Sequence, residues 1–144
     1  MTSALHFALR KLSRRAMHSQ RLYTLMEEAG FDEKECSQAL LYLREKGFLD
    51  DESYSASFVQ GWQKRGKSRR QILEKAKVQC MDVGELATHF GDEKQVLEEL
   101  IAKRYSLLLQ KNCSYIDKQK AIQSLMRRGF SYHTIVEILS TNSV

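Results

Sequence analysis

Apolar residues recur along the whole chain with the spacing of amphipathic helices. In every long segment they lie three or four residues apart, and no run of alternating apolar and polar residues is bounded by hairpin turn residues. The 144-residue chain also contains no proline, the residue that most strongly disrupts a helix interior. The pattern therefore predicts an all-α fold.

A three-residue segment recurs at nearly equal intervals. It appears as Gly30–Asp32, Cys80–Asp82 and Gly129–Ser131, at intervals of 50 and 49 residues, each time after a short amphipathic stretch. Apolar residues keep the same registers around the three segments. The matching positions are Leu22, Ile72 and Ala121; Met26, Ala76 and Leu125; Cys36, Leu86 and Ile135; and Leu40, Phe90 and Leu139. Such self-similarity predicts an internal repeat.

The recurring segment has the chemistry of a helix end. Gly30 and Gly129 suit the left-handed conformation in which many helices stop. Cys80 stands at the equivalent place in the middle repeat. Because its side chain disfavours that conformation, the sequence leaves open whether the middle repeat closes in the same way.

The same segment also predicts a helix start. Asp32, Asp82 and Ser131 lie where N-cap residues are needed. Glu35 and Glu85 follow the two aspartates by three residues, a spacing that predicts capping boxes.

A further helix before each helix pair completes a unit of three helices. These first helices are predicted at about residues 4–13, 51–64 and 92–111. The predicted repeats span residues 1–49, 50–90 and 91–144. Because a helical unit of this size buries too little apolar surface alone, we expect the three to pack end to end in an elongated, curved array.

Positive charge is concentrated in short stretches. The chain has 23 Lys and Arg residues against 18 Asp and Glu, a net charge of +5. From Lys64 to Lys77 there are seven basic residues against Glu74 alone, and Arg10–Arg21 contains no acid. Clustered positive charge favours an anionic partner, either a nucleic acid or an acidic protein surface.

The candidate contact residues are basic side chains at predicted helix ends. They are Lys64, Arg65, Lys67, Arg69 and Arg70 in the longest basic stretch, with Arg14, Arg15, Arg127 and Arg128 elsewhere. Guanidinium groups pair with carboxylate and phosphate alike. Cations at a helix N-terminus oppose the macrodipole, so the longest stretch favours binding over a plain solvated surface.

The other two arginine pairs are less specific signals. Arg14 and Arg15 end a predicted helix, where a cation complements the dipole and needs no ligand. Arg127 corresponds to Glu28 in the first repeat and Val78 in the second, so the fold does not require a charge there.

Aromatic residues lie beside the longest basic stretch. Tyr54, Phe58 and Trp62 share one stripe of a predicted helix. Rings next to cations can stack on bases, but this spacing is more typical of core packing. Trp62, nearest the basic residues, is kept as a candidate contact.

Catalytic, metal and cofactor chemistry is not indicated. The four histidines are scattered, and no glycine-rich phosphate loop occurs. Acids at 50–52 fit the capping of a helix start better than metal ligation. Cys36, Cys80 and Cys113 lie far apart on or beside apolar faces and are interpreted as inert thiols. We expect neither an enzyme nor a cofactor.

Membrane and export signals are also missing from the sequence pattern. No window approaches the roughly 18 uninterrupted apolar residues of a membrane span. Residues 1–15 lack the apolar core of a signal peptide. A cytoplasmic monomer is expected.

One family has these features in the same order. Gly47–Val59 followed by Arg65–Ile72 closely resembles the hallmark of the RecX family, bacterial regulators of the RecA recombinase. Ala8–Arg15 and Leu125–Ile135 are similar to that family's first and last repeats. The family often has glycine and proline after the basic turn, where this chain has Ser68 and Arg69.

The resemblance implies three tandem three-helix repeats and RecA as the partner. Family members lie in the groove of the RecA filament on DNA. They typically limit filament growth, strand exchange, ATP hydrolysis and the co-protease activity behind the SOS response. The resemblance therefore implies a RecA regulator that makes charged contacts through its basic turns.

Two other functions remain open at this stage. A non-specific DNA-binding helical protein would act without RecA, holding single- or double-stranded DNA with a steep dependence on salt. A helical adaptor would bind some other acidic partner. Sequence-specific reading of the major groove is disfavoured because the final helix of each repeat begins with acidic or neutral residues.

Overall fold

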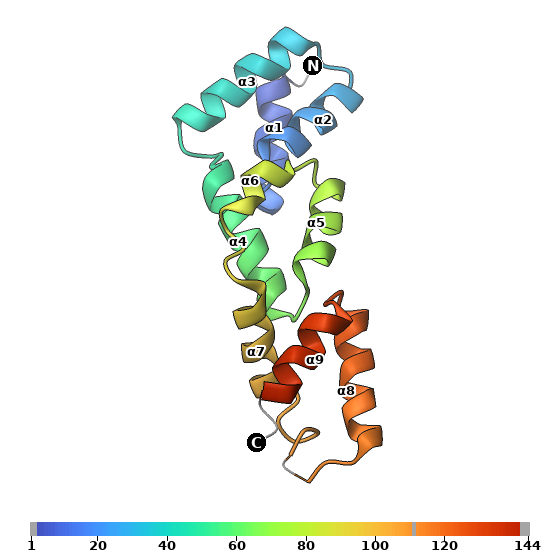
Figure 1. Ribbon diagram of the computed structural model, residues 1–144. Coiled ribbons are helices and arrows are strands. Elements are labelled where there is room, and N and C mark those ends of the chain that lie inside the picture. Colours follow the sequence, from blue (N-terminus) through green and yellow to red (C-terminus); the bar gives the residue numbers. More distant parts are fainter. Residues whose placement is uncertain (1–2, 111, 142–144) are drawn as a thin grey trace. The chain divides into compact units, whose positions relative to one another are not determined.

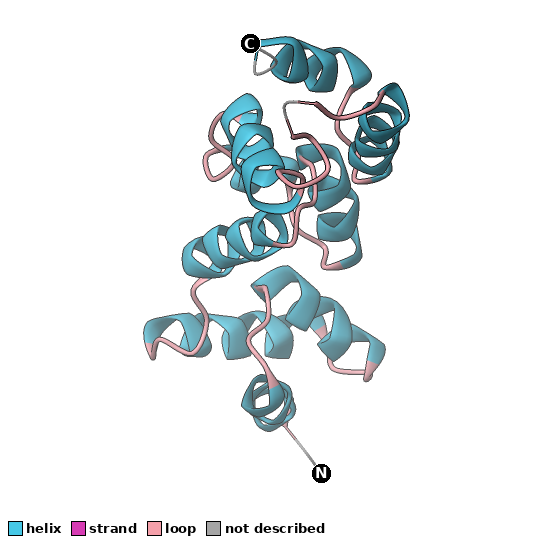
Figure 2. Cartoon of the chain, turned by 90° about the horizontal axis from the view of Figure 1, so that it is seen from below, coloured by secondary structure: helices cyan, strands magenta, loops and turns pink. Residues whose placement is uncertain are grey.

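The computed structural model describes residues 3–110 and 112–141. Within these residues the chain forms nine helices and no strand (Figures 1 and 2). The helices are α1 (Ala4–Arg14), α2 (Ser19–Glu28), α3 (Glu33–Glu45), α4 (Asp51–Lys64), α5 (Arg69–Val78), α6 (Val83–Ala87), α7 (Glu93–Arg104), α8 (Tyr115–Arg127) and α9 (Tyr132–Thr141). The predicted all-α class is confirmed.

The repeated turn has one geometry in all three places. Gly30, Cys80 and Gly129 have φ values of 97°, 58° and 99°. The following main-chain N–H reaches back to the same helical position each time. These bonds are Phe31 N to Met26 O (3.2 Å), Met81 N to Ala76 O (3.0 Å) and Phe130 N to Leu125 O (3.2 Å). The middle turn thus closes like the other two, although Cys80 adopts a conformation that suits glycine better.

The repeated apolar positions form the core. Of the twelve residues that share registers, all are buried except Leu139, which is half-buried. Their burial confirms that the register found in the sequence is the register of the packed helices.

N-caps follow the recurring segment as predicted. The side chains of Asp32, Asp82 and Ser131 each accept a hydrogen bond from a main-chain N–H of the helix that follows. Within the basic stretch, Ser68 is the N-cap of α5: its hydroxyl accepts a hydrogen bond of 3.3 Å from Gln71 N. Serine is a favoured N-cap, so the missing glycine and proline do not prevent a regular helix start.

The two predicted capping boxes are wrong. Glu35 does not turn back to its own cap; its Oε1 accepts from the main-chain N–H of Ala4 at 2.9 Å. Glu85 instead faces His18, with 2.7 Å between Oε2 and Nε2. Each acid instead contacts the N-terminal end of a helix that is distant in sequence. In the described residues a capping box forms at Ser114.

Helix α7 is shorter than predicted. It ends at Arg104, and Tyr105 leaves the helical conformation with φ −118° and ψ 4°. The Tyr105 ring is buried and its hydroxyl lies 2.6 Å from Ser124 Oγ. Leu107 continues the apolar spacing that suggested a longer helix, yet it is 82% exposed. The predicted end at Lys111 lies outside the described residues.

The chain divides into two compact units, residues 1–58 with 75–89, and residues 59–74 with 90–144. In the first unit α1, α2 and α3 pack around a core that includes Leu22, Met26 and Leu43. In the second, α9 packs on α7 and α8 around a core that includes Leu97 and Leu125. The division passes through α4 and α5. The repeat boundaries at 49/50 and 90/91 stay a prediction.

Candidate functional site

The basic turn, residues 64–70, joins α4 to α5 within the second unit. Gly66, at φ 83°, and a bond of 3.0 Å from Lys67 N to Trp62 O close the end of α4. Lys64, Arg65, Arg69 and Arg70 are exposed, whereas Lys67 is half-buried and Ser68 is buried. The turn therefore holds its backbone inside the unit and directs most of its cations outward.

Two arginines from other helices reach this turn. Arg104, the last residue of α7, donates from Nη1 to the carbonyl oxygen of Arg65 (3.2 Å) and from Nη2 to that of Lys64 (3.1 Å). Arg128, the C-cap of α8, donates from Nη1 to the same Arg65 carbonyl oxygen at 3.0 Å and from Nε to the Tyr105 hydroxyl at 3.2 Å. Two guanidinium groups thus converge on the C-terminus of α4, where the helix dipole favours positive charge.

In the part of the chain that the structure describes, neither arginine forms an ion pair with a carboxylate. We call the cations at this place the basic cluster: Lys64, Arg65, Lys67, Lys103, Arg104 and Arg128. Among the described residues, none of the ion pairs within 4.0 Å involves a cation of the basic cluster. Like charges held close together raise the local positive potential and attract an anion. Carboxylate and phosphate are the groups that such guanidinium forks pair with.

Three cations of the turn, one of them in the basic cluster, lie against a ring or an acid. The Arg65 guanidinium carbon lies 4.8 Å from the centre of the Trp62 ring, and that of Arg69 lies 4.9 Å from the centre of the Phe90 ring. Such cation–π contacts hold an arginine in place and keep its charge. Arg70 Nε lies 3.9 Å from Glu74 Oε1 in an exposed pair, which contributes little stability.

A second helix end docks on the basic turn. Ser68 N donates to the carbonyl oxygen of Arg128 at 3.1 Å, and Gln71 Nε2 donates to that of Arg127 at 2.7 Å. A Cβ on Gly129 would meet the side chains of both Ser68 and Gln71. The glycine thus permits the close approach, and the arginines at 127 and 128 join residues 64–70 at one site.

The predicted contact residues fall in two places. Residues 64–70, 127 and 128 come together in the second unit. Arg14 and Arg15 are exposed at the end of α1, in the first unit. Lys103 and Arg104 were missed, because in the last turn of α7 they resemble ordinary dipole-complementing cations. No periodic signal in the sequence connects them with the basic turn.

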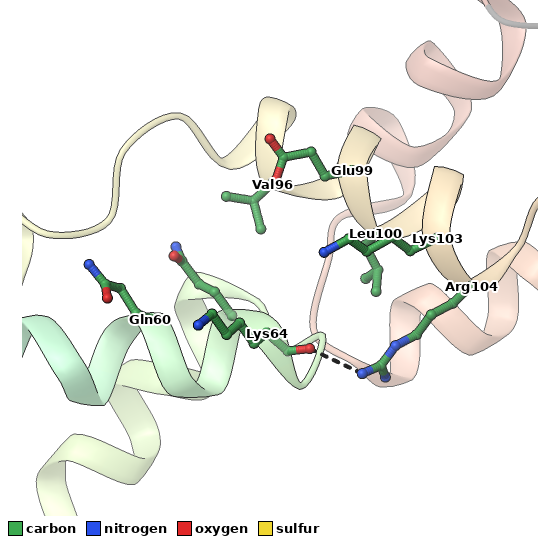
Figure 3. Close-up of a pocket in the computed structure, with 8 residues that line it drawn as sticks. Gln60, Lys64, Val96, Glu99, Leu100, Lys103 and Arg104 are labelled. Atoms are coloured by element: carbon green, nitrogen blue, oxygen red, sulfur yellow. Dashed lines mark hydrogen bonds between the residues drawn. The ribbon is translucent and has the colours of Figure 1, made fainter.

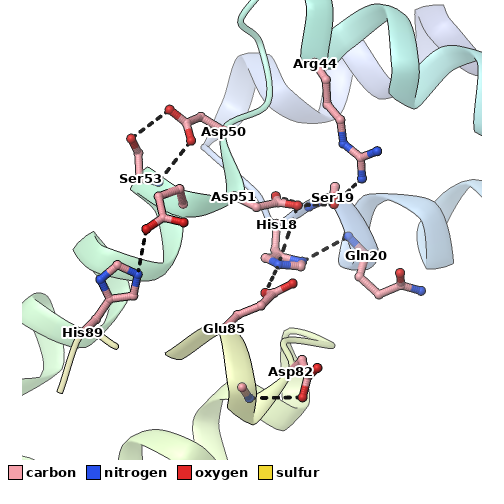
Figure 4. Close-up of polar contacts among 12 residues, drawn as sticks. His18, Ser19, Gln20, Arg44, Asp50, Asp51, Ser53, Asp82, Glu85 and His89 are labelled. Carbon is pink, nitrogen blue, oxygen red and sulfur yellow. Dashed lines mark hydrogen bonds and ion pairs between the residues drawn. The ribbon is translucent and has the colours of Figure 1, made fainter. Parts of the chain in front are cut away.

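A polar network in the first unit brings the buried His18 and Ser19 together with acids that are half-buried or exposed (Figure 4). His18 Nδ1 accepts from Gln20 N at 3.1 Å and Nε2 faces Glu85. The hydroxyl and the main-chain N–H of Ser19 both donate to Asp51. In a catalytic triad the serine donates to the histidine, whereas here the serine donates to the acid. The network caps α2 and ties it to α4 and α6.

The acids at 50–52 are engaged at helix ends. Asp50 accepts from the main-chain N–H of Ser53 at 3.1 Å and from its hydroxyl at 2.9 Å, and these bonds lower the pKa of Asp50. Glu52 lies 3.6 Å from His89. No group of three His, Cys, Asp or Glu residues in the described part of the chain could hold a metal ion. The predicted capping role is confirmed for Asp50.

Known proteins show similarity over the whole chain. Residues 92–139 match the family model described as RecX, third three-helix domain. A regulatory protein RecX of Clostridium perfringens is 26% identical over 143 residues, which cover 94% of this chain and 68% of the relative. A regulatory protein RecX of Leuconostoc citreum is 25% identical and is matched by 100% of this chain, over 56% of its own length.

Two solved structures share the fold. The crystal structure of RecX from Lactobacillus salivarius aligns with a TM-score of 0.69 at 22% identity, over 96% of this chain and 93% of that one. A crystal structure of a regulatory protein RecX aligns with a TM-score of 0.73 at 22% identity, over 96% and 72%. Tandem three-helix repeats fit both. No helix in the described residues has the length and apolar character to span a membrane.

Proposed function

The chain belongs to the RecX family of regulatory proteins, and from this premise we propose that it binds the RecA filament on DNA and restrains RecA. The restrained activities are recombinase action, ATP hydrolysis and co-protease activity. The protein acts as a monomer in the bacterial cytoplasm, by contact and without a cofactor. Its contact residues are those of the basic turn together with Arg127 and Arg128, and Arg14 and Arg15 at the end of α1.

One observation carries this proposal. Arg104 and Arg128 converge on a single carbonyl oxygen of the basic turn, and no acid pairs with them among the described residues. A folded protein normally pairs or disperses such charge, because unpaired cations at close range repel one another. A partner that presents carboxylates or phosphates removes this repulsion. The groove of a nucleoprotein filament offers both groups.

The experiment is RecA ATP hydrolysis on single-stranded DNA, with DNA in excess so that competition for sites is ruled out. We expect a slower rate when the protein is added. Arg69 and Arg70, both reversed to Glu, test the basic turn. Acids at a helix N-terminus complement the dipole, so we expect the variant to stay helical, which circular dichroism checks, and to lose inhibition.

A matched control carries the same charge change elsewhere. Lys118 and Lys120 are exposed on α8, and their reversal to Glu should leave inhibition intact. If native protein does not change the rate or the filament length, the RecA proposal is wrong. If both double variants lose inhibition equally, net charge rather than the basic turn is responsible.

The same cations also fit a second function, non-specific DNA binding without RecA. Six cations in one cluster could neutralise several phosphates, and binding to bare DNA would then weaken steeply with salt. Titration of a fluorescent oligonucleotide at several salt concentrations separates the two functions. Tight, steeply salt-dependent binding without RecA would favour this second function.

A further inference from the structure

A small pocket lies between α4 and α7 within the second unit (Figure 3). Its volume is about 190 Å³. The lining residues are Gln60, Gln63, Lys64, Val96, Glu99, Leu100, Lys103 and Arg104. Small-molecule sites occupy roughly 300–1,000 Å³, so this pocket is too small for a nucleotide and fits one side chain.

The lining combines positive charge with an apolar wall. Lys64, Lys103 and Arg104 supply three cations against one acid, Glu99. Arg104 is fixed by its bonds to the end of α4, and Figure 3 shows its guanidinium held against the Lys64 carbonyl. Leu100, in the second half of α7, is a buried member of the core that also lines the pocket. Such a lining accepts a ligand that has a short apolar stem and an anionic tip.

The charge and the size of the pocket together favour a carboxylate over a phosphate. A doubly charged phosphomonoester would face the Glu99 carboxylate with twice the repulsion that a singly charged carboxylate meets. The phosphodiester of a nucleic acid carries one charge, as a carboxylate does, and differs from it in shape. A phosphodiester strand is bulky and regular, and gains little from a pocket that admits one group. A glutamate or aspartate side chain matches both the volume and the apolar wall.

We propose that this pocket receives the carboxylate side chain of a glutamate or aspartate from an acidic segment of a protein partner. The inference rests on the proposed function in taking that partner to be a protein. It adds a defined recognition element, which distinguishes a docked acidic residue from diffuse attraction between charged surfaces. Lys103 and Lys64 position the carboxylate from opposite helices, and Val96 and Leu100 contact its methylene groups.

Methyl NMR of the full chain tests the pocket without RecA. The probe is the blocked tripeptide acetyl-Ala-Glu-Ala-amide, and the matched probe is acetyl-Ala-Gln-Ala-amide. We expect the glutamate peptide to shift the methyl signals of Val96 and Leu100 in a saturable manner that salt suppresses. The glutamine peptide should leave them unchanged. Lys64→Gln with Lys103→Gln should remove the shifts, whereas Lys118→Gln with Lys120→Gln should not.

Each contrary outcome overturns the inference in a recognisable way. Equal shifts from both peptides would mean that charge is not recognised. Absence of a saturable shift would mean that the pocket does not bind a carboxylate. Shifts from a thymidine oligonucleotide alone would assign the pocket to phosphate. If the peptide result is as expected and RecA hydrolysis is unaffected, the pocket stands while the RecA proposal fails.

Discussion

The carboxylate of Glu93 accepts a hydrogen bond at 2.8 Å from the main-chain N–H of Arg69. These are the first residues of α7 and α5. Asp51, which begins α4, makes the equivalent bond of 2.9 Å to the N–H of Ser19, which begins α2. In both units an acid therefore stabilises the N-terminus of another helix. The Glu93 carboxylate offsets the unfavourable interaction between the helix dipole and the cations that begin α5. The cations gathered at the end of α4 are therefore the stronger candidates for binding.

Replacing Glu93 by Gln should lower the free energy of unfolding by about 0.3–1 kcal/mol, because α5 loses a negative charge at its N-terminus while the amide oxygen can still accept the hydrogen bond. Urea unfolding measures the change. Glu98→Gln removes a charge from an exposed position on the same helix and should change stability far less. Equal losses in the two variants would contradict a specific role for Glu93.

Arg127 and Arg128 are adjacent in sequence but differ in burial and in the contacts of their side chains. Arg128 is half-buried and bonds to Tyr105 and to the basic turn, whereas Arg127 is exposed. Arg128→Ala removes the hydrogen bonds of a charged donor to the Tyr105 hydroxyl and to the Arg65 carbonyl oxygen. The loss should cost about 1–3 kcal/mol, although each of these groups keeps another partner. Arg127→Ala should change stability by less than about 0.5 kcal/mol. Thermal unfolding of both variants checks the difference; similar melting temperatures would show that the guanidinium contacts of Arg128 contribute no stability.

The sequence predicts contacts between residues close together along the chain, but not contacts between residues far apart. The turns at Gly30, Cys80 and Gly129 are specified by residues within one helical turn, so self-comparison finds them. The bonds from Arg104 to the basic turn cross 39 and 40 residues, and that from Glu93 crosses 24. Such pairs have no spacing rule, because packing of separate helices brings them together. Glu35 was misassigned for the same reason.

Two glycines with the same backbone conformation separate local strain from docking. Gly30 and Gly129 have φ values of 97° and 99°, but a Cβ on Gly30 would meet open space. Gly30→Ala should therefore cost about 1–2 kcal/mol, the strain of a left-handed residue. Gly129→Ala should cost more, because its Cβ would collide with Ser68 and Gln71. Equal losses in urea unfolding would show that the docked turn adapts without cost.

The thiol of Cys36 should be the least reactive of the three. Its side chain is fully buried, and burial, with the nearby acids Glu27, Asp32 and Glu35, raises the pKa of Cys36. Less thiolate then exists at mildly alkaline pH, and the thiolate is the nucleophile. Iodoacetamide labelling followed by peptide mass spectrometry should show Cys80 and Cys113, both half-buried, modified first. Early labelling of Cys36 would indicate that this core opens readily.

The acid dependence of stability should contain a part due to Asp50. Hydrogen bonds from Ser53 hold the pKa of Asp50 below its ordinary value in the folded protein. The carboxylate therefore contributes stability that is fully present above the unfolded pKa of about 3.9 and is lost as the pH falls through the lower folded pKa. Asp50→Asn keeps an N-cap but cannot titrate. We expect the stability difference between native protein and variant to shrink between about pH 5 and about pH 2, measured by urea unfolding at each pH. Ser53→Ala, which removes one of the donors, should reproduce part of this loss, and a difference that stays constant over the range would show that the bonds to Ser53 do not favour the charged form.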